Sequence, residues 1–299
     1  MTEPAEGLEV IHSGPATVTE CPVWDIQTQA LWWVDIYNGV IHRIVWSERL
    51  HSSQEVGAPV TCLALRRDGG LIIAKQGGIW AADEDENGLL TLEQQPIPGT
   101  TTPVAGTRFN DGKCDQQGRF WIGTILDGAP GDSAGLYVLS PPNPLRSVLA
   151  GANVSNGLDW NPEGTVLYFI DSATRCVDTI QCDPVGGTLG DRRTLARIEP
   201  DAGAPDGLTV DAEGNVWVAL SGGWQVRCYT PGGDLARVIH LPVSKVTSCT
   251  FGGPSLNDLF ITSARRRLSD AELAEQPLAG SIFRIRLDVA GRPAARFAG

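Results

Sequence analysis

The sequence predicts an all-β protein, a six-bladed β-propeller in which residues 1–299 form a single domain. Three observations support this prediction. A two-strand unit recurs at steps of 41 to 50 residues, the composition is rich in turn formers (35 Gly and 20 Pro), and only one segment has a helical pattern. Repeats of this length, with a glycine-bearing turn and an aromatic strand, are typical of propeller blades. A β-sandwich or two small barrels would not explain the near-constant step.

The clearest copy of the unit is the stretch A-P-D-G-L-T-V-D-A-E-G-N-V-W-V-A-L at residues 204–220. Residues 207–210 form a short apolar strand, residues 211–215 have turn chemistry, and residues 216–220 form a second strand rich in β-formers. Asp206 lies on the loop that enters the first strand.

Six segments align on this unit, and further strands are expected after several of them. The aligned anchor residues are Glu20, Thr61, Asn110, Asn156, Asp206 and Ser248. Third strands are predicted at 40–44, 135–139, 225–229 and 281–285. Residues 8–11 are expected to pair with the C-terminal strands, because an unclosed propeller would expose a sheet edge.

One segment departs from the strand pattern. Ser269 is followed three residues later by Glu272, which is a capping box and predicts a short helix. The 268–280 segment is therefore interpreted as an insertion in the last blade, either a surface loop or a lid.

The bulk composition excludes several classes of function. The net charge of −12 argues against a nucleic-acid or anionic-membrane partner. Seven dispersed cysteines without a C-x-x-C motif argue against structural zinc and a disulfide framework. The first residues do not resemble a signal peptide, and no apolar run reaches membrane-spanning length. We therefore expect a cytoplasmic protein.

Four of the six anchors carry oxygen donors, namely Glu20, Asn110, Asn156 and Asp206. Because the innermost strands of a propeller surround one axis, these side chains should face one another at the mouth of a central funnel. Carboxylate and carboxamide oxygens suit a hard divalent cation. The alternative is that Asn or Asp before Gly is ordinary turn chemistry. Glu20 weighs against that alternative, because Glu is a poor turn residue.

Other catalytic candidates are weaker. The four histidines, His12, His42, His51 and His240, are scattered along the sequence, and no G-x-S-x-G motif supports a serine–histidine triad. Cysteines 62, 114 and 249 alternate with apolar residues and are predicted to be core residues.

Several motifs in fixed order resemble the gluconolactonase/regucalcin (SMP-30) family. They are T-E-C-P-V-W-D, R-F-N-D-G-K-C-D, N-G-L-D-W, P-D-G-L-T-V-D and F-G-G-P-S-L-N-D-L-F-I-T-S-A-R, and the match runs from about residue 16 to 290. The resemblance implies a six-bladed propeller with one divalent metal, which hydrolyses aldonolactones to sugar acids.

The resemblance also implies roles for particular residues. By position, the metal-binding Glu, Asn and Asp of the family fall on Glu20, Asn156 and Asp206, and its substrate-contacting Arg and Asn fall on Arg108 and Asn110. A further acidic substrate contact would fall in the loop 126–132, on either Asp127 or Asp132.

These roles predict a mechanism. The metal, Ca²⁺ first, with Mg²⁺, Mn²⁺, Zn²⁺ or Fe²⁺ as alternatives, would polarise the lactone carbonyl, and Asp206 would orient or deprotonate the attacking water. The expected partner is a small sugar lactone, with the protein a monomer or weak homodimer. Two other functions stay open: hydrolysis of another ester, such as a phosphotriester or a non-sugar lactone, and calcium binding by a non-enzymatic propeller.

Overall fold

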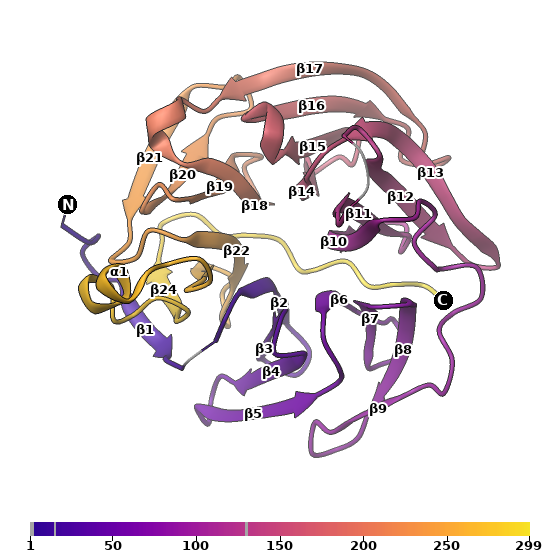
Figure 1. The fold of residues 1–299 in the computed structure, drawn as a ribbon, viewed down its shortest axis with the longest axis horizontal. Helices are drawn as coiled ribbons and strands as arrows, with labels where there is room; N and C mark the ends of the chain where they lie inside the picture. The colour runs from indigo at the N-terminus through magenta and orange to yellow at the C-terminus, as the bar shows by residue number, and fades with distance from the viewer. Residues whose placement is uncertain (1–2, 15, 129–130) are drawn as a thin grey trace.

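The computed structural model describes residues 3–14, 16–128 and 131–299. Within these ranges the strands form six four-stranded sheets arranged around a central axis (Figure 1). The predicted all-β, six-bladed propeller is thus confirmed. No helix in the described ranges has both the length and the apolar character needed to cross a membrane.

Five blades follow chain order from the inner to the outer strand. The first is β2 (Thr19–Asp25), β3 (Ala30–Asp35), β4 (Val40–Val45) and β5 (Leu50–Glu55). The second is β6 (Val60–Leu65), β7 (Leu71–Lys75), β8 (Gly78–Glu84) and β9 (Leu90–Leu92), and the third is β10 (Thr107–Cys114), β11 (Phe120–Leu126), β12 (Ala134–Ser140) and β13 (Asn143–Ala152). The fourth is β14 (Ser155–Trp160), β15 (Val166–Asp171), β16 (Cys176–Cys182) and β17 (Leu189–Arg197), and the fifth is β18 (Ala204–Val210), β19 (Val216–Ser221), β20 (Gln225–Tyr229) and β21 (Leu235–His240). Short 3₁₀ turns η1 (Ser172–Thr174) and η2 (Pro200–Ala202) lie between strands.

The sixth blade combines both ends of the chain. It consists of β22 (Val246–Gly252), β23 (Asp258–Ser263) and β24 (Ile282–Arg286), with β1 (Glu9–His12) as its outer strand. β1 runs antiparallel to β24, with Glu9 opposite Arg284, and these two side chains form an ion pair at 3.0 Å. The edge of β24 is therefore covered by a strand from the other end of the chain.

The hairpins that open the third and fifth blades share a turn of the form D-x-x-G-x-x-W. Asp211 accepts hydrogen bonds from the backbone N–H groups of Glu213 and Asn215, and from the indole Nε1 of Trp217 at 2.9 Å. Asp115 likewise accepts a bond from Trp121 Nε1 at 2.7 Å. The turn carboxylate thus joins the loop to the buried face of the next strand.

The hydrophobic core lies between neighbouring sheets. Trp24 of the first blade stacks on Phe260 of the last blade, with ring centroids 5.6 Å apart, and both side chains are buried. The cysteines at 62, 114 and 249 are 0%, 4% and 2% exposed, which confirms that they are core residues.

The insertion in the last blade contains the expected helix. α1 spans Asp270–Glu275, and Ser269 and Glu272 form the capping box. The buried Gln276 follows the helix, and its Oε1 accepts a hydrogen bond from the backbone N–H of Ser244 at 2.7 Å. α1 lies over the last blade, away from the centre of the molecule (Figure 1).

The C-terminal segment, residues 287–299, crosses the centre of the propeller (Figure 1). It bonds to residues of all six blades: Asp25, Leu65, Gly118, Trp160, Ala212 and Leu256. Near its end, the buried ring of Phe297 belongs to the same core as β6 and β7.

Candidate functional site

All six inner hairpins have an irregular strand register at the same level. The register shifts lie at Glu20/Val23, Val60/Cys62, Phe109/Gly112, Ser155/Leu158, Pro205/Leu208 and Val246/Cys249. Each anchor residue identified from the sequence therefore lies at or within a β-bulge. Bulges reorient side chains and are common beside functional sites. They bring the anchors to one end of the channel that the inner strands surround.

The glycines after two anchors serve strand packing. Gly157 and Gly207 lie inside β14 and β18, so the interpretation of Asn156-Gly157 and Asp206-Gly207 as turns is wrong. A Cβ atom on Gly207 would lie 2.1 Å from Ser248 Oγ, and one on Gly157 would lie 2.6 Å from the backbone N of Leu208. Glycine is required because neighbouring inner strands approach closely here.

A hydrogen bond links two of the anchors, and a third lies beside them. Asn110 Nδ2 donates to Asn156 Oδ1 at 3.0 Å, and Asn156 lies close enough to Asp206 to lower the pKa of its carboxyl group. Ser172, in η1, accepts a bond from Asn156 Nδ2 at 2.9 Å and donates to the carbonyl oxygen of Pro205 at 2.6 Å. The carboxamide of Asn156 is therefore held in place by Asn110 and by Ser172.

The two candidate carboxylates lie close enough to repel each other. Burial, followed by the charges of Asp206 and Asp111, raises the pKa of Glu20 well above its usual range. Asp206 retains some exposed surface but is surrounded by protein, and burial, followed by the charge of Asp111, raises its pKa to about 8. Cys21, beside Glu20, has a left-handed backbone (φ 49°), a conformation that clusters at functional sites. Glu20, Asp206 and Asp111 thus place several acidic groups close together.

Asp111 is a third carboxylate that sequence reasoning did not single out. Burial raises its pKa to about 6, although the charge of Lys113 opposes this shift. It follows Asn110 in the N-D-G motif, so its position beside an anchor was a usable signal. Ser172 and Tyr37, by contrast, lie outside the repeated motifs.

Arg108 lies beside the anchors on β10. Its guanidinium donates to Asn110 Oδ1 at 3.2 Å and to the Tyr37 hydroxyl at 3.3 Å. Arg266 covers the same Tyr37 ring, with its guanidinium carbon 4.1 Å from the centroid. Two cationic side chains thus flank one partly exposed tyrosine.

Asp127 and Asp132 are held differently. Asp132 Oδ1 accepts a hydrogen bond from Asn153 Nδ2 at 2.9 Å, whereas for Asp127 it is the backbone N–H that bonds, to Gly106 O at 2.6 Å. Ala129 and Pro130 of the intervening loop lie outside the described residues. An acidic substrate contact from this loop stays a prediction.

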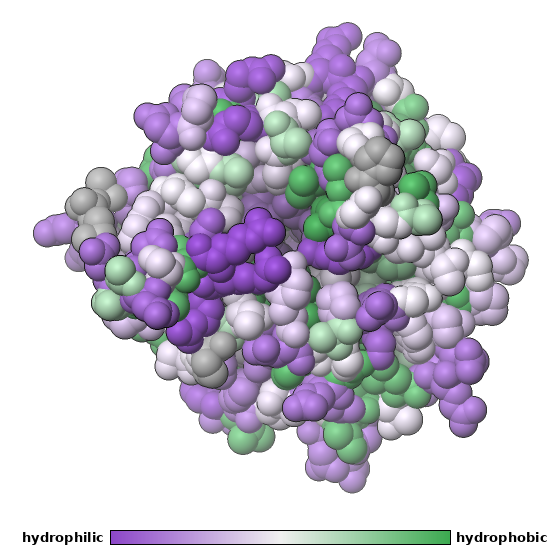
Figure 2. Space-filling view, viewed as in Figure 1, coloured by the Kyte–Doolittle hydropathy of each residue, from purple (hydrophilic) through white to green (hydrophobic). Residues whose placement is uncertain are grey.

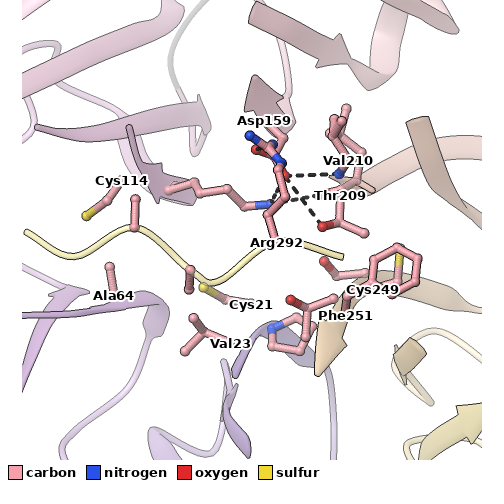
Figure 3. Close-up of a pocket in the computed structure, with 18 of the residues that line it drawn as sticks. Cys21, Val23, Ala64, Cys114, Asp159, Thr209, Val210, Cys249, Phe251 and Arg292 are labelled. Carbon is pink, nitrogen blue, oxygen red and sulfur yellow. Dashed lines mark hydrogen bonds and ion pairs between the residues drawn. The ribbon is translucent and has the colours of Figure 1, made fainter. Parts of the chain in front are cut away.

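A cavity of about 90 Å³ occupies the channel beyond the anchors (Figure 3). Its wall residues, such as Val23, Ala64 and Val210, follow the anchors by three or four positions, and the C-terminal segment borders it. At the cavity, Asp159 forms ion pairs with Lys113 at 2.9 Å and Arg292 at 3.2 Å. Asp159 is thus paired with two cations, unlike Glu20 and Asp206.

Three of the four histidines, which are scattered along the sequence, lie together in space. Ring nitrogens of His12, His42 and His51 all lie within 4.8 Å of one another. They converge because β1 closes the last blade next to the first blade, a contact that linear spacing does not reveal.

The face shown in Figure 2 is hollowed near its centre, and hydrophilic side chains border the hollow. Fold and site together define a class of protein: a six-bladed β-propeller with buried carboxylates and carboxamides at one level of its central channel. The chain belongs to the SMP-30/Gluconolactonase/LRE-like family, whose sequence model matches residues 18–265.

Three relatives illustrate the range of this family. Regucalcin from Xenopus laevis is 33% identical over 299 residues, which cover 98% of each chain. A 6-deoxy-6-sulfogluconolactonase from Pseudomonas putida is 35% identical over 297 residues, covering 98% of this chain and 99% of that protein. The solved structure of a calcium-binding protein, regucalcin from Agrobacterium tumefaciens str. C58, covers 96% of each chain with a TM-score of 0.88 and 25% identity.

Proposed function

We propose that this protein is a divalent-metal-dependent sugar lactonase, which hydrolyses an aldonolactone to the corresponding sugar acid. The observation that carries the proposal is the convergence of Glu20, Asn156 and Asp206 in the channel, with Arg108 and Asn110 alongside. The lactonase among the relatives supports a lactone as substrate.

The donor set fits a hard cation. Glu20 and Asp206 are carboxylates that repel each other, and neither forms an ion pair with a Lys, Arg or His of the described residues. The charge of Lys245 lowers the pKa of Asp206 but does not return it to its usual range. These two carboxylates and Asn156 Oδ1 would hold the ion, Ca²⁺ first, with Mg²⁺, Mn²⁺, Zn²⁺ or Fe²⁺ as alternatives. When bound, such an ion supplies Lewis-acid polarisation of the lactone carbonyl.

Asp206 would orient the attacking water and accept its proton. The oxygen of the water bonds to the carbonyl carbon, the ring C–O bond breaks, and the proton passes to the ring oxygen, which becomes a hydroxyl. Asn156, which lies close enough to Asp206 to lower its pKa, would help to keep that side chain in one orientation. The product is a hydroxy acid that ionises at neutral pH.

Arg108 and Asn110 would bind the sugar. The Arg108 guanidinium bonds to Asn110 Oδ1 and Tyr37 Oη, so its remaining N–H groups have a defined direction. They could donate to sugar hydroxyls and to the carboxylate that forms on ring opening.

The proposal is tested with isosteric variants of the donor set. We expect Glu20→Gln and Asp206→Asn to lower kcat/KM for the best aldonolactone by roughly 10³-fold or more. Each variant removes a ligand of the ion that would activate the carbonyl, and Asp206→Asn also removes the proton acceptor. Since each variant removes a repelled buried charge, thermal unfolding in chelator should occur at the same or a higher temperature. Ser248→Ala, at an anchor without an assigned ligand role, is the matched control and should retain activity.

Full activity of Asp206→Asn would refute the mechanism. Tight calcium binding by a wild-type protein that opens no lactone would instead favour a calcium-binding propeller. Faster turnover of a phosphotriester or a non-sugar lactone than of any aldonolactone would favour another ester as substrate.

A further inference from the structure

Three imidazole rings meet where the first and last blades adjoin. His12 ends β1, the outer strand of the last blade, whereas His42 and His51 lie on β4 and β5 of the first blade. His51 pairs with Ile44, so His42 and His51 are diagonal neighbours on one face of that sheet. His42 Nδ1 lies 3.1 Å from His51 Nε2, and one nitrogen from each of the three rings falls within 4.8 Å of the others.

The cluster has a rigid floor and an open side. Trp33 is fully buried, and the His42 ring stacks on it with an interplanar angle of 3° and a centroid distance of 5.1 Å. The His12 ring lies 5.3 Å from Trp33 and 4.2 Å from His51. His51 is exposed, so solutes can reach the cluster without opening the fold.

The pKa values of all three rings are lowered, which favours the neutral imidazoles that a metal ion requires, and the hydrogen bond between His42 and His51 would be replaced by bonds to the metal. Burial and the charge of His51 lower the pKa of His12 to about 4, burial and the charges of His51 and His12 lower that of His42 to about 4, and burial lowers that of His51. Among carboxylates, the charge of Asp35 acts on His42 and raises its pKa slightly against the other causes. The oxygens of Asp35 accept hydrogen bonds from Thr17 and Asn38, so they are not counted as ligands. The donor set is therefore nitrogen alone.

We propose that His12, His42 and His51 form a transition-metal site for Zn²⁺, separate from the oxygen-donor site in the channel. Imidazole favours Zn²⁺, Cu²⁺ and Ni²⁺, whereas carboxylate and carboxamide oxygens favour Ca²⁺ and Mg²⁺. Tetrahedral Zn–N bonds of about 2.0–2.1 Å place nitrogens about 3.4 Å apart. The His42–His51 pair is already near that spacing, and modest rotation of the partly exposed rings closes the remaining gap. A solvent molecule would complete the coordination.

The position of the site gives it a structural consequence. The ion would join β1 to β4 and β5, and so link the strand that completes the last blade to the first blade. Since Zn²⁺ would bind the folded state and not the separated strands, it should raise the unfolding temperature in a concentration-dependent way. A role in turnover is not required.

The test uses tag-free, full-length protein stripped with a chelator and then held in excess Ca²⁺. We expect one equivalent of Zn²⁺ to bind by calorimetry, one equivalent of Co²⁺ to give the visible absorption of a tetrahedral complex, and Zn²⁺ to raise the unfolding temperature. His51→Gln and His12→Gln should weaken Zn²⁺ binding by at least the roughly 10- to 100-fold that loss of even an outer partner costs. His240→Gln, the fourth histidine, is the matched control and should bind like wild type, as should Asp206→Asn.

Three results would overturn the proposal. Zn²⁺ binding of unchanged affinity in His51→Gln would place the ion elsewhere. Loss of Zn²⁺ binding in Asp206→Asn, with retention in His51→Gln, would assign it to the channel. Absence of any Zn²⁺-induced rise in the unfolding temperature of the wild-type protein would mean that no ion links the two blades. Because His51 is exposed, its replacement should not prevent folding.

Discussion

At the residue scale, the pKa of the Asp206 carboxyl group reports the environment of the channel most directly. This pKa is raised to about 8 by burial and by the charge of Asp111. An unfolded chain would titrate this group near 3.9. Between these two values the folded state binds more protons than the unfolded state, so the free energy of unfolding falls as pH rises.

We therefore predict that the metal-free protein loses stability as pH rises from 6.5 to about 8, and that Asp206→Asn removes much of this loss. Histidines 12 and 42, with pKa values of about 4, act in the opposite direction, but only below about pH 6.5, where unfolded histidine protonates. Urea unfolding in chelator across this window measures the slope. The exposed Asp68→Asn should leave it unchanged. A wild-type slope in Asp206→Asn would show that this carboxyl is ionised throughout.

The same scale shows what sequence could and could not provide. Register among the repeats was enough to select Glu20, Asn156 and Asp206 as anchors. It could not show that Gly157 and Gly207 face a neighbouring strand, because a glycine that avoids a steric clash has the same sequence signal as one in a turn. Asp111 was missed because it lies one position after its anchor, and only the bulge brings it near the others.

At the element scale, the turn carboxylates of the third and fifth blades act as internal braces. Asp211 is fully buried and accepts bonds from two turn amides, from the Asn215 side chain and from Trp217. The corresponding turn of the second blade has the exposed Asp68 and no tryptophan after it.

We predict that Asp211→Ala lowers the free energy of unfolding by about 3 kcal/mol, because several buried donors lose their acceptor. Asp211→Asn, which keeps one oxygen acceptor, should cost less, and Asp68→Ala should change it by no more than about 0.5 kcal/mol. Urea denaturation measures all three. Equal effects at the two aspartates would mean that the turn sequence matters and the contact with tryptophan does not.

Strand prediction succeeded for the buried strands and for β1, the outer strand of the last blade, but it missed other outer strands. β2 and β3, or β18 and β19, are nearly continuous buried runs with turn residues between them. The outer strands β5 and β17, L-H-S-S-Q-E and L-G-D-R-R-T-L-A-R, are largely exposed and polar. Their pairing comes from the preceding strand and not from apolar alternation, so no hydrophobic pattern marks them.

At the scale of the whole molecule, the C-terminal segment connects the blades to one another. Its bonds reach residues of all six blades, and Phe297 is buried in the core that includes β6 and β7. We propose that residues 1–299 unfold as one cooperative domain, because blades that are tied through a shared segment and a shared last sheet cannot open independently.

Phe297→Ala tests this proposal. Loss of a fully buried ring should lower the free energy of unfolding by about 3–5 kcal/mol, with a single transition retained. Val185→Ala, at a position that is 84% exposed, should change it by no more than about 0.5 kcal/mol. Urea unfolding followed by tryptophan fluorescence and by circular dichroism gives both numbers. Two separated transitions would show that the blades fold as independent groups.

The central claim is that this propeller hydrolyses sugar lactones with a divalent ion held by its channel oxygens. The most direct test is hydrolysis of a panel of pentono- and hexonolactones by purified protein, with chelator and after restoration of each divalent ion, and with the spontaneous rate subtracted. We predict turnover that chelator abolishes and Ca²⁺ or another divalent ion restores. Rates equal to those of buffer with every ion, or turnover that is insensitive to chelator, would contradict the claim.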